Sequence, residues 1–169
     1  MILEETTLST PAGDLRLVFH DGTLVSLSFP AEGDGPRERL RKRFENVRFV
    51  PLERANEAVR MLRAYFDGDL TAIDRIPVDT GGTPFQRRVW EELRKIPAGR
   101  PIAYAELARR VGDPRATRAV GTANGANPVA IVVPCHRVVA TGGKLGGYGG
   151  GLDRKRWLLA HEEKAALAP

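Results

Sequence analysis

Apolar and polar residues alternate along the first thirty residues of the chain, which is the pattern of β-strands with one buried face. Strand composition covers Ile2–Thr10, Asp14–His20 and Leu24–Phe29, with Pro11-Ala12-Gly13 and Asp21-Gly22 between them. Asp-Gly between two alternating stretches is a strong signal for a tight hairpin. The sequence therefore predicts an antiparallel three-stranded meander at the N-terminus.

The apolar spacing changes to the helical period after a polar Gly/Pro loop at residues 31–36. A short charged helix is expected over Arg37–Glu45, and a second helix should end at Gly68. The apolar residues that carry this second helix are Leu52, Ala55, Val59, Leu62 and Phe66. The segment Leu70–Gly82 contains a proline and a Gly-Gly pair, so it is the candidate linker.

A clear helix start opens the second half of the chain. Thr83 can cap a helix, and Pro84 suits the first helical position. Phe85, Val89, Leu93 and Ile96 form the apolar stripe of that helix. Two short helices, Ala103–Val111 and Arg115–Asn124, then flank the tight turn Gly112-Asp113-Pro114. This is the pattern of a helix-turn-helix, a weak signal by itself because many helical hairpins bind nothing.

The chain continues with an apolar run, Val129–Val133, that reads as a buried strand. Pro134, Cys135, His136 and Arg137 follow it directly. Residues 142–151 contain seven glycines. A last helix is expected to begin with Asp153 as its cap, and Trp157, Leu158 and His161 lie near one of its faces.

Charge is distributed unequally along the chain. Its net charge is +5, of which residues 1–79 contribute −3 and residues 80–169 contribute +8. A basic second half suits a polyanionic partner, although a solvated basic surface would have the same composition. Because no segment has the pattern of a membrane span or a signal peptide, we expect a cytoplasmic protein.

The single cysteine, Cys135, excludes an internal disulfide and a multi-cysteine zinc site. It could be an ordinary buried apolar residue. However, His136 and Arg137 are groups that favour the reactive thiolate, provided that the chain turns at Pro134. Such a cysteine–histidine pair needs a third group to orient the imidazole, and Glu162 or Glu163 of the last helix could serve. His136 could equally be a hydrogen-bonded structural residue.

These residues carry a resemblance to a known family. The nonapeptide Ile131–Val139 is similar to the active-site signature of O6-alkylguanine-DNA alkyltransferases, also called methylated-DNA–protein-cysteine methyltransferases. The similarity covers roughly residues 83–163 and is specific in order and spacing. Its other motifs are Tyr104-Ala105-Glu106-Leu107-Ala108, Arg118-Ala119-Val120-Gly121, Asn127-Pro128, Gly147-Tyr148 and Trp157-Leu158-Leu159-Ala160-His161-Glu162.

The resemblance implies an α+β protein of two domains. Residues 1–79 would form a ribonuclease H-like domain built on an antiparallel sheet. Residues 80–169 would form a mostly helical domain that carries the helix-turn-helix and the alkyl-acceptor site. The first half is similar to the family only in length and in its order of strands before helices.

The resemblance also implies roles for individual residues. Cys135 would accept the alkyl group, and His136 would take the thiol proton through a water molecule. Glu162 would orient His136, and Tyr104 would donate a hydrogen bond or proton to the leaving guanine. Each residue also has an ordinary structural reading, such as a core aromatic for Tyr104 or a solvated charge for Glu162.

DNA recognition is assigned by the same resemblance to the second helix of the pair, where Arg118 would fill the space left by a flipped nucleotide. Alternatively, Arg118 could be one more phosphate-facing arginine. The expected DNA-binding residues are Arg115, Thr117, Arg118, Ala119 and Gly121. Those expected around the bound base are Asn127, Val138, Tyr148 and Gly149. Thr117 and Thr122 stand where many members have smaller residues.

The resulting hypothesis is a direct-reversal DNA repair protein that is consumed by one transfer from O6-alkylguanine to Cys135, with O4-alkylthymine as a further substrate to consider. Its partner would be double-stranded DNA entered from the minor groove, and the protein would act as a monomer with neither metal nor organic cofactor. Three alternatives remain: a damage-binding relative without transfer, a helix-turn-helix regulator with a structural cysteine, and a cysteine hydrolase that turns over repeatedly.

Overall fold

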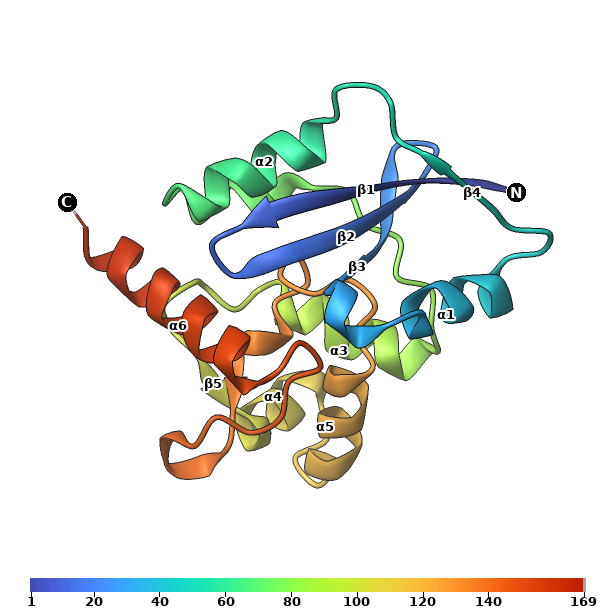
Figure 1. Ribbon diagram of the computed structural model, residues 1–169. Coiled ribbons are helices and arrows are strands. Elements are labelled where there is room, and N and C mark those ends of the chain that lie inside the picture. The colour runs from blue at the N-terminus through green and yellow to red at the C-terminus, as the bar shows by residue number, and fades with distance from the viewer. Residues whose placement is uncertain (169) are drawn as a thin grey trace.

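The N-terminal strands form as their alternation predicts (Figure 1). In the computed structural model, which describes residues 1–168, β1 (Ile2–Thr10), β2 (Gly13–His20) and β3 (Thr23–Ser28) pair antiparallel in sequence order. Asp21 and Gly22 both have positive φ, 47° and 81°. A two-residue hairpin turn of type I′ requires this conformation at both positions, so the Asp-Gly signal is confirmed.

The sheet has a fourth strand that the sequence pattern did not reveal. β4 (Arg48–Pro51) lies parallel to β1 at the edge, giving the strand order β3-β2-β1-β4. The strand has four residues and ends at a proline, so it carries too little alternation to be recognised. Consequently the predicted start of the next helix at Leu52 is wrong. α2 (Glu57–Phe66) begins later, where the Asn56 side chain accepts a hydrogen bond from Val59 N.

The remaining helices are close to their predicted positions, and the α+β class is confirmed. α1 (Gly35–Arg43) begins two residues earlier than expected, after a 3₁₀ turn, η1 (Pro30–Glu32), in the predicted polar loop. The C-terminal helices are α3 (Pro84–Leu93), α4 (Tyr104–Val111), α5 (Thr117–Gly125) and α6 (Leu152–Leu167). Thus α4 and α5 form the predicted helix pair.

Two local predictions in the second half are wrong. Asp153 does not cap α6, because Gly151 occupies that position and Asp153 pairs with Arg156 within the first turns. Val129–Val133 is buried but forms tight turns, in which Val133 N bonds to Val129 O at 3.0 Å and Ile131 has φ of 69°. A short apolar run establishes burial without establishing the backbone conformation.

The outer edge of β3 connects the two halves of the chain. Leu27 exchanges backbone hydrogen bonds with Pro128 O at 3.0 Å and Ala130 N at 3.1 Å. Leu24 does the same with Pro77 O and Asp79 N, within the predicted linker, which also holds η2 (Ala72–Arg75). These bonds fix the segment before Cys135 against the N-terminal sheet. Because the division at residues 79 and 80 was inferred from sequence alone, it stays a prediction.

One hydrophobic cluster extends from the sheet into the C-terminal helices, and it includes residues from β1 to α6. In Figure 1 the helices α3, α4 and α5 lie together on one side of the sheet, below it in this view. Among residues 1–168 no helix combines the length and the apolar character needed to cross a membrane. In the same part of the chain, no three metal-binding side chains converge on a site.

Candidate active site

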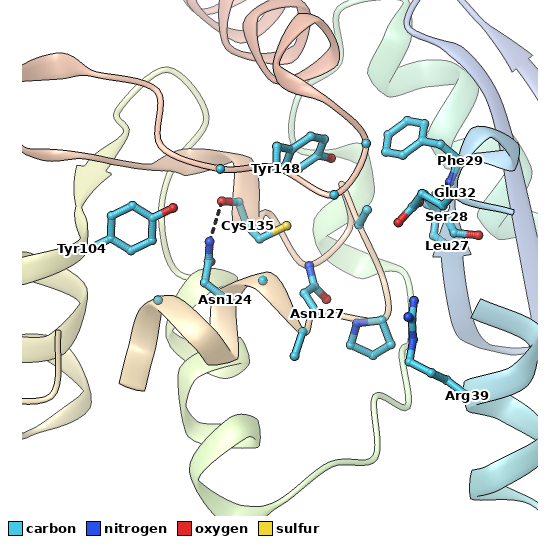
Figure 2. Close-up of a pocket in the computed structure, with 18 residues that line it drawn as sticks. Leu27, Ser28, Phe29, Glu32, Arg39, Tyr104, Asn124, Asn127, Cys135 and Tyr148 are labelled. Carbon is cyan, nitrogen blue, oxygen red and sulfur yellow. Dashed lines mark hydrogen bonds between the residues drawn. The ribbon is translucent and has the colours of Figure 1, made fainter. Parts of the chain in front are cut away.

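Cys135 borders a cavity of about 470 Å³ that lies between the two halves of the chain (Figure 2). Its walls come from the end of β3, from η1 and α1, from α4 and α5, and from the glycine-rich loop, residues 142–151. The side chains that border it include Phe29, Glu32, Arg39, Tyr104, Asn124, Asn127, Cys135 and Tyr148. The cavity therefore brings N-terminal residues to a cysteine that lies about a hundred residues later in the sequence.

A tight turn presents Cys135 to this cavity. η3 (Cys135–Arg137) is a single 3₁₀ turn directly after Pro134, so the chain does turn where a cysteine–histidine pair requires it. Cys135 is 8% exposed. Burial raises the pKa of its thiol, while the Asn127 amide and the Lys155 ammonium act in the opposite direction. The thiol is therefore protonated at neutral pH, and it must lose its proton before or during a reaction.

His136 forms a fully buried pair with Glu162. Its Nε2 lies 2.9 Å from Glu162 Oε2, and both side chains have no exposed surface. A carboxylate can only accept, so Nε2 carries the hydrogen and Nδ1 is the basic nitrogen. Nδ1 is buried and has no hydrogen-bond partner within residues 1–168. Burial lowers the pKa of His136 despite the facing carboxylate, which leaves a neutral imidazole able to accept a proton.

Two further side chains hold Glu162. The sequence analysis gave Tyr65 no role and expected Arg137 to favour the Cys135 thiolate, but the Arg137 guanidinium is bound to Glu162 instead. Arg137 donates from Nη2 to Oε2 at 2.8 Å and from Nε to Oε1 at 3.0 Å, while its Nη1 donates to Ile96 O. Tyr65 of α2 donates from its hydroxyl to Oε2 at 2.8 Å. Burial alone would raise the pKa of Glu162, but His136 and Arg137 lower it far below its usual range. We call Tyr65, His136, Arg137 and Glu162 the Glu162 network.

A pair of two-residue strands places Tyr104 beside the cysteine segment. β5 (Ile102–Ala103) pairs in parallel with β6 (Val138–Val139), which directly follows η3, so α4 begins beside the end of β6. Tyr104 is half-buried, and burial raises the pKa of its phenol, which keeps it a proton donor at neutral pH. Asn124, from the buried face of α5, donates to Cys135 O at 3.3 Å.

Asn127 and Lys155 brace the backbone around Cys135. Asn127 donates from Nδ2 to Val133 O at 2.7 Å and accepts from Val129 N at 3.0 Å, so it closes the turn that precedes the cysteine. Lys155 is fully buried and donates to Val138 O at 2.7 Å and to Gly147 O at 3.1 Å. Lysine side chains are mostly exposed to solvent, so the sequence did not indicate that Lys155 is buried.

The end of the glycine-rich loop packs against the N-terminal half. The Tyr148 and Phe29 rings meet edge to face with centroids 6.0 Å apart. A Cβ on Gly150 would lie 2.4 Å from the Phe29 ring, so only glycine fits there. Gly149 is exposed and lies beside Glu32. At the other end of the loop, a Cβ on Gly146 would lie 3.0 Å from the Tyr104 hydroxyl oxygen. The loop thus covers the cavity from Tyr104 to Phe29.

The residues expected to bind DNA lie on one exposed face of the helix pair. Thr117, Arg118 and Ala119 are exposed, while Gly121 is half-buried and borders the cavity. The opposite face of α5 is buried through Val120, Ala123 and Asn124. Arg115 lies in the turn between the helices with 96% of its side chain exposed. The exposed face of α5 is therefore continuous with the mouth of the cavity.

Several known proteins are similar to this chain in sequence. The family described as 6-O-methylguanine DNA methyltransferase, DNA binding domain, matches residues 84–164. A methylated-DNA–protein-cysteine methyltransferase of Shigella flexneri is 58% identical over 60% of this chain and 59% of its own length. A protein of the same name from Mycolicibacterium paratuberculosis is 48% identical over 99% of this chain and 96% of its own length.

Similarity to solved structures extends over almost the whole fold. The crystal structure of Mycobacterium tuberculosis OGT in complex with DNA has a TM-score of 0.81 and 40% identity, over 98% of this chain and 94% of that one. The sequence match that spans both proteins and the structural match agree. The chain therefore belongs to the methylated-DNA–protein-cysteine methyltransferase family.

Proposed function

We propose that the protein repairs DNA by moving the alkyl group of O6-alkylguanine onto the sulfur of Cys135, and that each molecule acts once. The observation that carries this proposal is the position of Cys135 on a cavity, next in sequence to a histidine whose Nε2 is bound to Glu162 and whose Nδ1 is free to accept a proton. This is the arrangement of an activated nucleophile with an oriented base. The family of the chain supports it.

In the proposed reaction the Cys135 sulfur attacks the alkyl carbon, and the bond between that carbon and O6 breaks. The thiol proton passes to His136 Nδ1 through water, and the Glu162 carboxylate stabilises the imidazolium that forms. The pair of electrons from the broken bond remains on the guanine. Because the product is a thioether, which water does not cleave, the cysteine is not regenerated.

The leaving guanine needs a proton donor and a donor to O6. The Tyr104 phenol is protonated at neutral pH and borders the cavity, so it suits the first role. The backbone N–H of Gly149 lies in the loop that covers the cavity, and we assign it to O6. Val138 and Tyr148 would complete the walls around the base, with Asn127 bracing the turn below it.

Because O6 of guanine is inside the base stack, the nucleotide must leave the duplex before it can reach Cys135. We propose that α5 enters the minor groove with Thr117, Ala119 and Gly121 against the DNA, Arg115 near the backbone and Arg118 in place of the flipped nucleotide. The small size of Ala119 and Gly121 and the exposure of Arg118 support this arrangement. We further propose that the protein acts as a monomer in the cytoplasm.

Our first prediction tests the stoichiometry. With excess duplex that contains O6-methylguanine, intact-mass measurement should find one methyl group per chain, and peptide mapping should place it on Cys135. Cys135→Ser should abolish transfer because an alcohol is a far weaker nucleophile than a thiolate at neutral pH, while DNA binding is kept. Repeated turnover would instead indicate a hydrolase, and binding without any mass gain would indicate a damage-binding protein or a regulator.

A further inference from the structure

The cavity continues beyond the sulfur of Cys135, on the side away from Tyr104. In Figure 2 the sulfur points toward the wall formed by Ser28, Phe29, Glu32 and Arg39, whereas Tyr104 lies on the opposite side of Cys135. If Tyr104 meets the guanine, as the proposed function requires, an alkyl group on O6 extends toward that wall. We call these four residues and the space they border the adduct compartment.

Glu32 is the negatively charged group of this compartment, and it is fixed in place. Its Oε2 accepts a hydrogen bond from Phe29 N at 2.8 Å, which closes η1 onto the end of β3. Its Oε1 lies 3.2 Å from the position that a Cβ of Gly149 would occupy. The carboxylate therefore stands between the N-terminal wall and the glycine-rich loop, at the point where a long adduct would pass.

The charge of Glu32 reaches the reacting sulfur. Burial is the main cause of the raised pKa of the Cys135 thiol, and the Glu32 carboxylate adds to it. A second negative charge placed between Glu32 and the sulfur would be repelled by this carboxylate, which the bond from Phe29 N holds beside the cavity. An uncharged group of the same shape would meet no such repulsion.

Three cations lie near this compartment, and within residues 1–168 no ion pair joins any of them to Glu32. The Arg154 guanidinium lies over the Phe29 ring, 4.7 Å from its centroid, and donates to Ala12 O and Gly150 O. Lys155 is buried and its ammonium is bound to Val138 O and Gly147 O. Arg39 borders the cavity but is exposed, and no ion pair within residues 1–168 holds its guanidinium. Water screens both charges, since Glu32 is exposed as well, but the hydrogen bond from Phe29 N holds the Glu32 carboxylate at the compartment wall.

We propose that Glu32 is a specificity-determining residue, which makes the adduct compartment accept neutral or cationic O6 substituents and disfavour those that end in a negative charge. This role rests on the proposed transfer to Cys135 and extends it to the choice of adduct. It would give the N-terminal half of the chain a direct part in the selection of damage, beside its packing against the C-terminal half.

The test compares two adducts of nearly equal shape, O6-carboxymethylguanine and its neutral amide, O6-carbamoylmethylguanine, in the same duplex. We expect single-turnover transfer at saturating duplex to be roughly tenfold faster with the amide, an effect between those of like charges about 4 Å apart in bulk water and near a protein surface, because Glu32 is exposed. Glu32→Gln keeps the acceptor for Phe29 N and should bring this ratio close to one. Because both rates come from one protein, effects on thiol reactivity cancel.

Glu38→Gln is the matched control, since it removes an equal charge from α1 at an exposed pair with Arg41. It should leave the ratio unchanged, and Arg39→Ala should alter it by less than about threefold if its charge is screened. A ratio near one in the unaltered protein, or one that Glu32→Gln leaves as it was, would overturn the role of Glu32. Transfer from O6-methylguanine, measured on the same proteins, distinguishes the two proposals. Absence of methyl transfer in the unaltered protein would overturn the proposed function itself.

Discussion

Cys135 has two unlike sides. On one side lies the Glu162 network, in which every side chain is buried and Glu162 Oε2 accepts from His136, Arg137 and Tyr65 together. On the other side lies the cavity, whose charged residues, Glu32 and Arg39, are exposed. The first side is dry and held by fixed donors and acceptors, as proton transfer requires. The second side is open and adaptable, as recognition of a flipped nucleotide requires.

This difference has consequences for mutation. A buried polar network cannot lose one partner without leaving another charge or hydrogen-bonding group unsatisfied, so a substitution there affects stability and chemistry together. A substitution at the cavity rim or on the exposed face of α5 leaves no buried group unpaired. It should change which DNA is repaired and how fast, with little effect on the fold.

The largest effect is expected inside the network, for Arg137→Met. Glu162 would lose the permanent cation that pairs with it and remain as a buried carboxylate, so the free energy of unfolding should fall by about 3–5 kcal/mol. Urea denaturation followed by circular dichroism measures this. Arg109→Met is the matched control, because it breaks an exposed pair with Glu106 and should cost less than about 1 kcal/mol. Equal losses for the two variants would show that the network contributes no more than a surface pair.

A smaller effect, confined to duplex DNA, is expected at α5. If Arg118 fills the space of the flipped nucleotide, Arg118→Ala should slow single-turnover repair at saturating duplex by about tenfold, which corresponds to about 1.4 kcal/mol at the transition state. Its reaction with the free alkylated base, which needs no flipping, should be nearly unchanged.

Arg115→Ala is the comparison for this experiment, because Arg115 is an exposed arginine in the turn before the same helix. If Arg115 contacts a phosphate, Arg115→Ala should weaken binding to all DNA and reduce the salt dependence of binding. It should leave the single-turnover rate at saturating duplex unchanged. If Arg118→Ala repairs saturating duplex as fast as the unaltered protein, Arg118 is such a contact too.

The two sides of Cys135 also differ in how far the sequence could predict them. Local patterns were sufficient for the β1–β3 meander, for the Thr83 cap and for the helix pair, because strand alternation, capping and turn residues act over a few positions. The Pro-Cys-His-Arg segment and the last helix suggested the partners Cys135, His136 and Glu162, which lie together around η3.

Contacts between distant segments were not predictable. Tyr65 is 97 positions from Glu162, and its pattern is that of an ordinary core aromatic on α2. Glu32 and Arg39 stand in a polar, charged stretch that reads as solvent-exposed, and they reach the cavity only because β3 pairs with residues 128–130. The turn conformation of Val129–Val133 depends on the Asn127 side chain, which a hydrophobic pattern does not contain.

The smallest effect is expected for Tyr65→Phe, which removes one of the three donors to Glu162 Oε2. The loss should cost about 0.5–1.5 kcal/mol of stability, since the carboxylate keeps its bonds to Arg137 and His136. With fewer donors the Glu162 carboxylate becomes a stronger acceptor for His136, so the substitution should raise the pKa of His136, which burial lowers in the unaltered protein.

A base acts only when unprotonated, so transfer should fall as the pH drops through the pKa of His136. In Tyr65→Phe this fall should occur at a higher pH, while the rate at pH 8 stays within about threefold, as expected for the loss of one modest hydrogen bond. The single-turnover rate with the free alkylated base, measured from pH 5 to 8, tests this without any contribution from DNA binding. If Tyr65→Phe lowers the rate of transfer by the same factor at every pH, Tyr65 only supports the packing of α2 against α6.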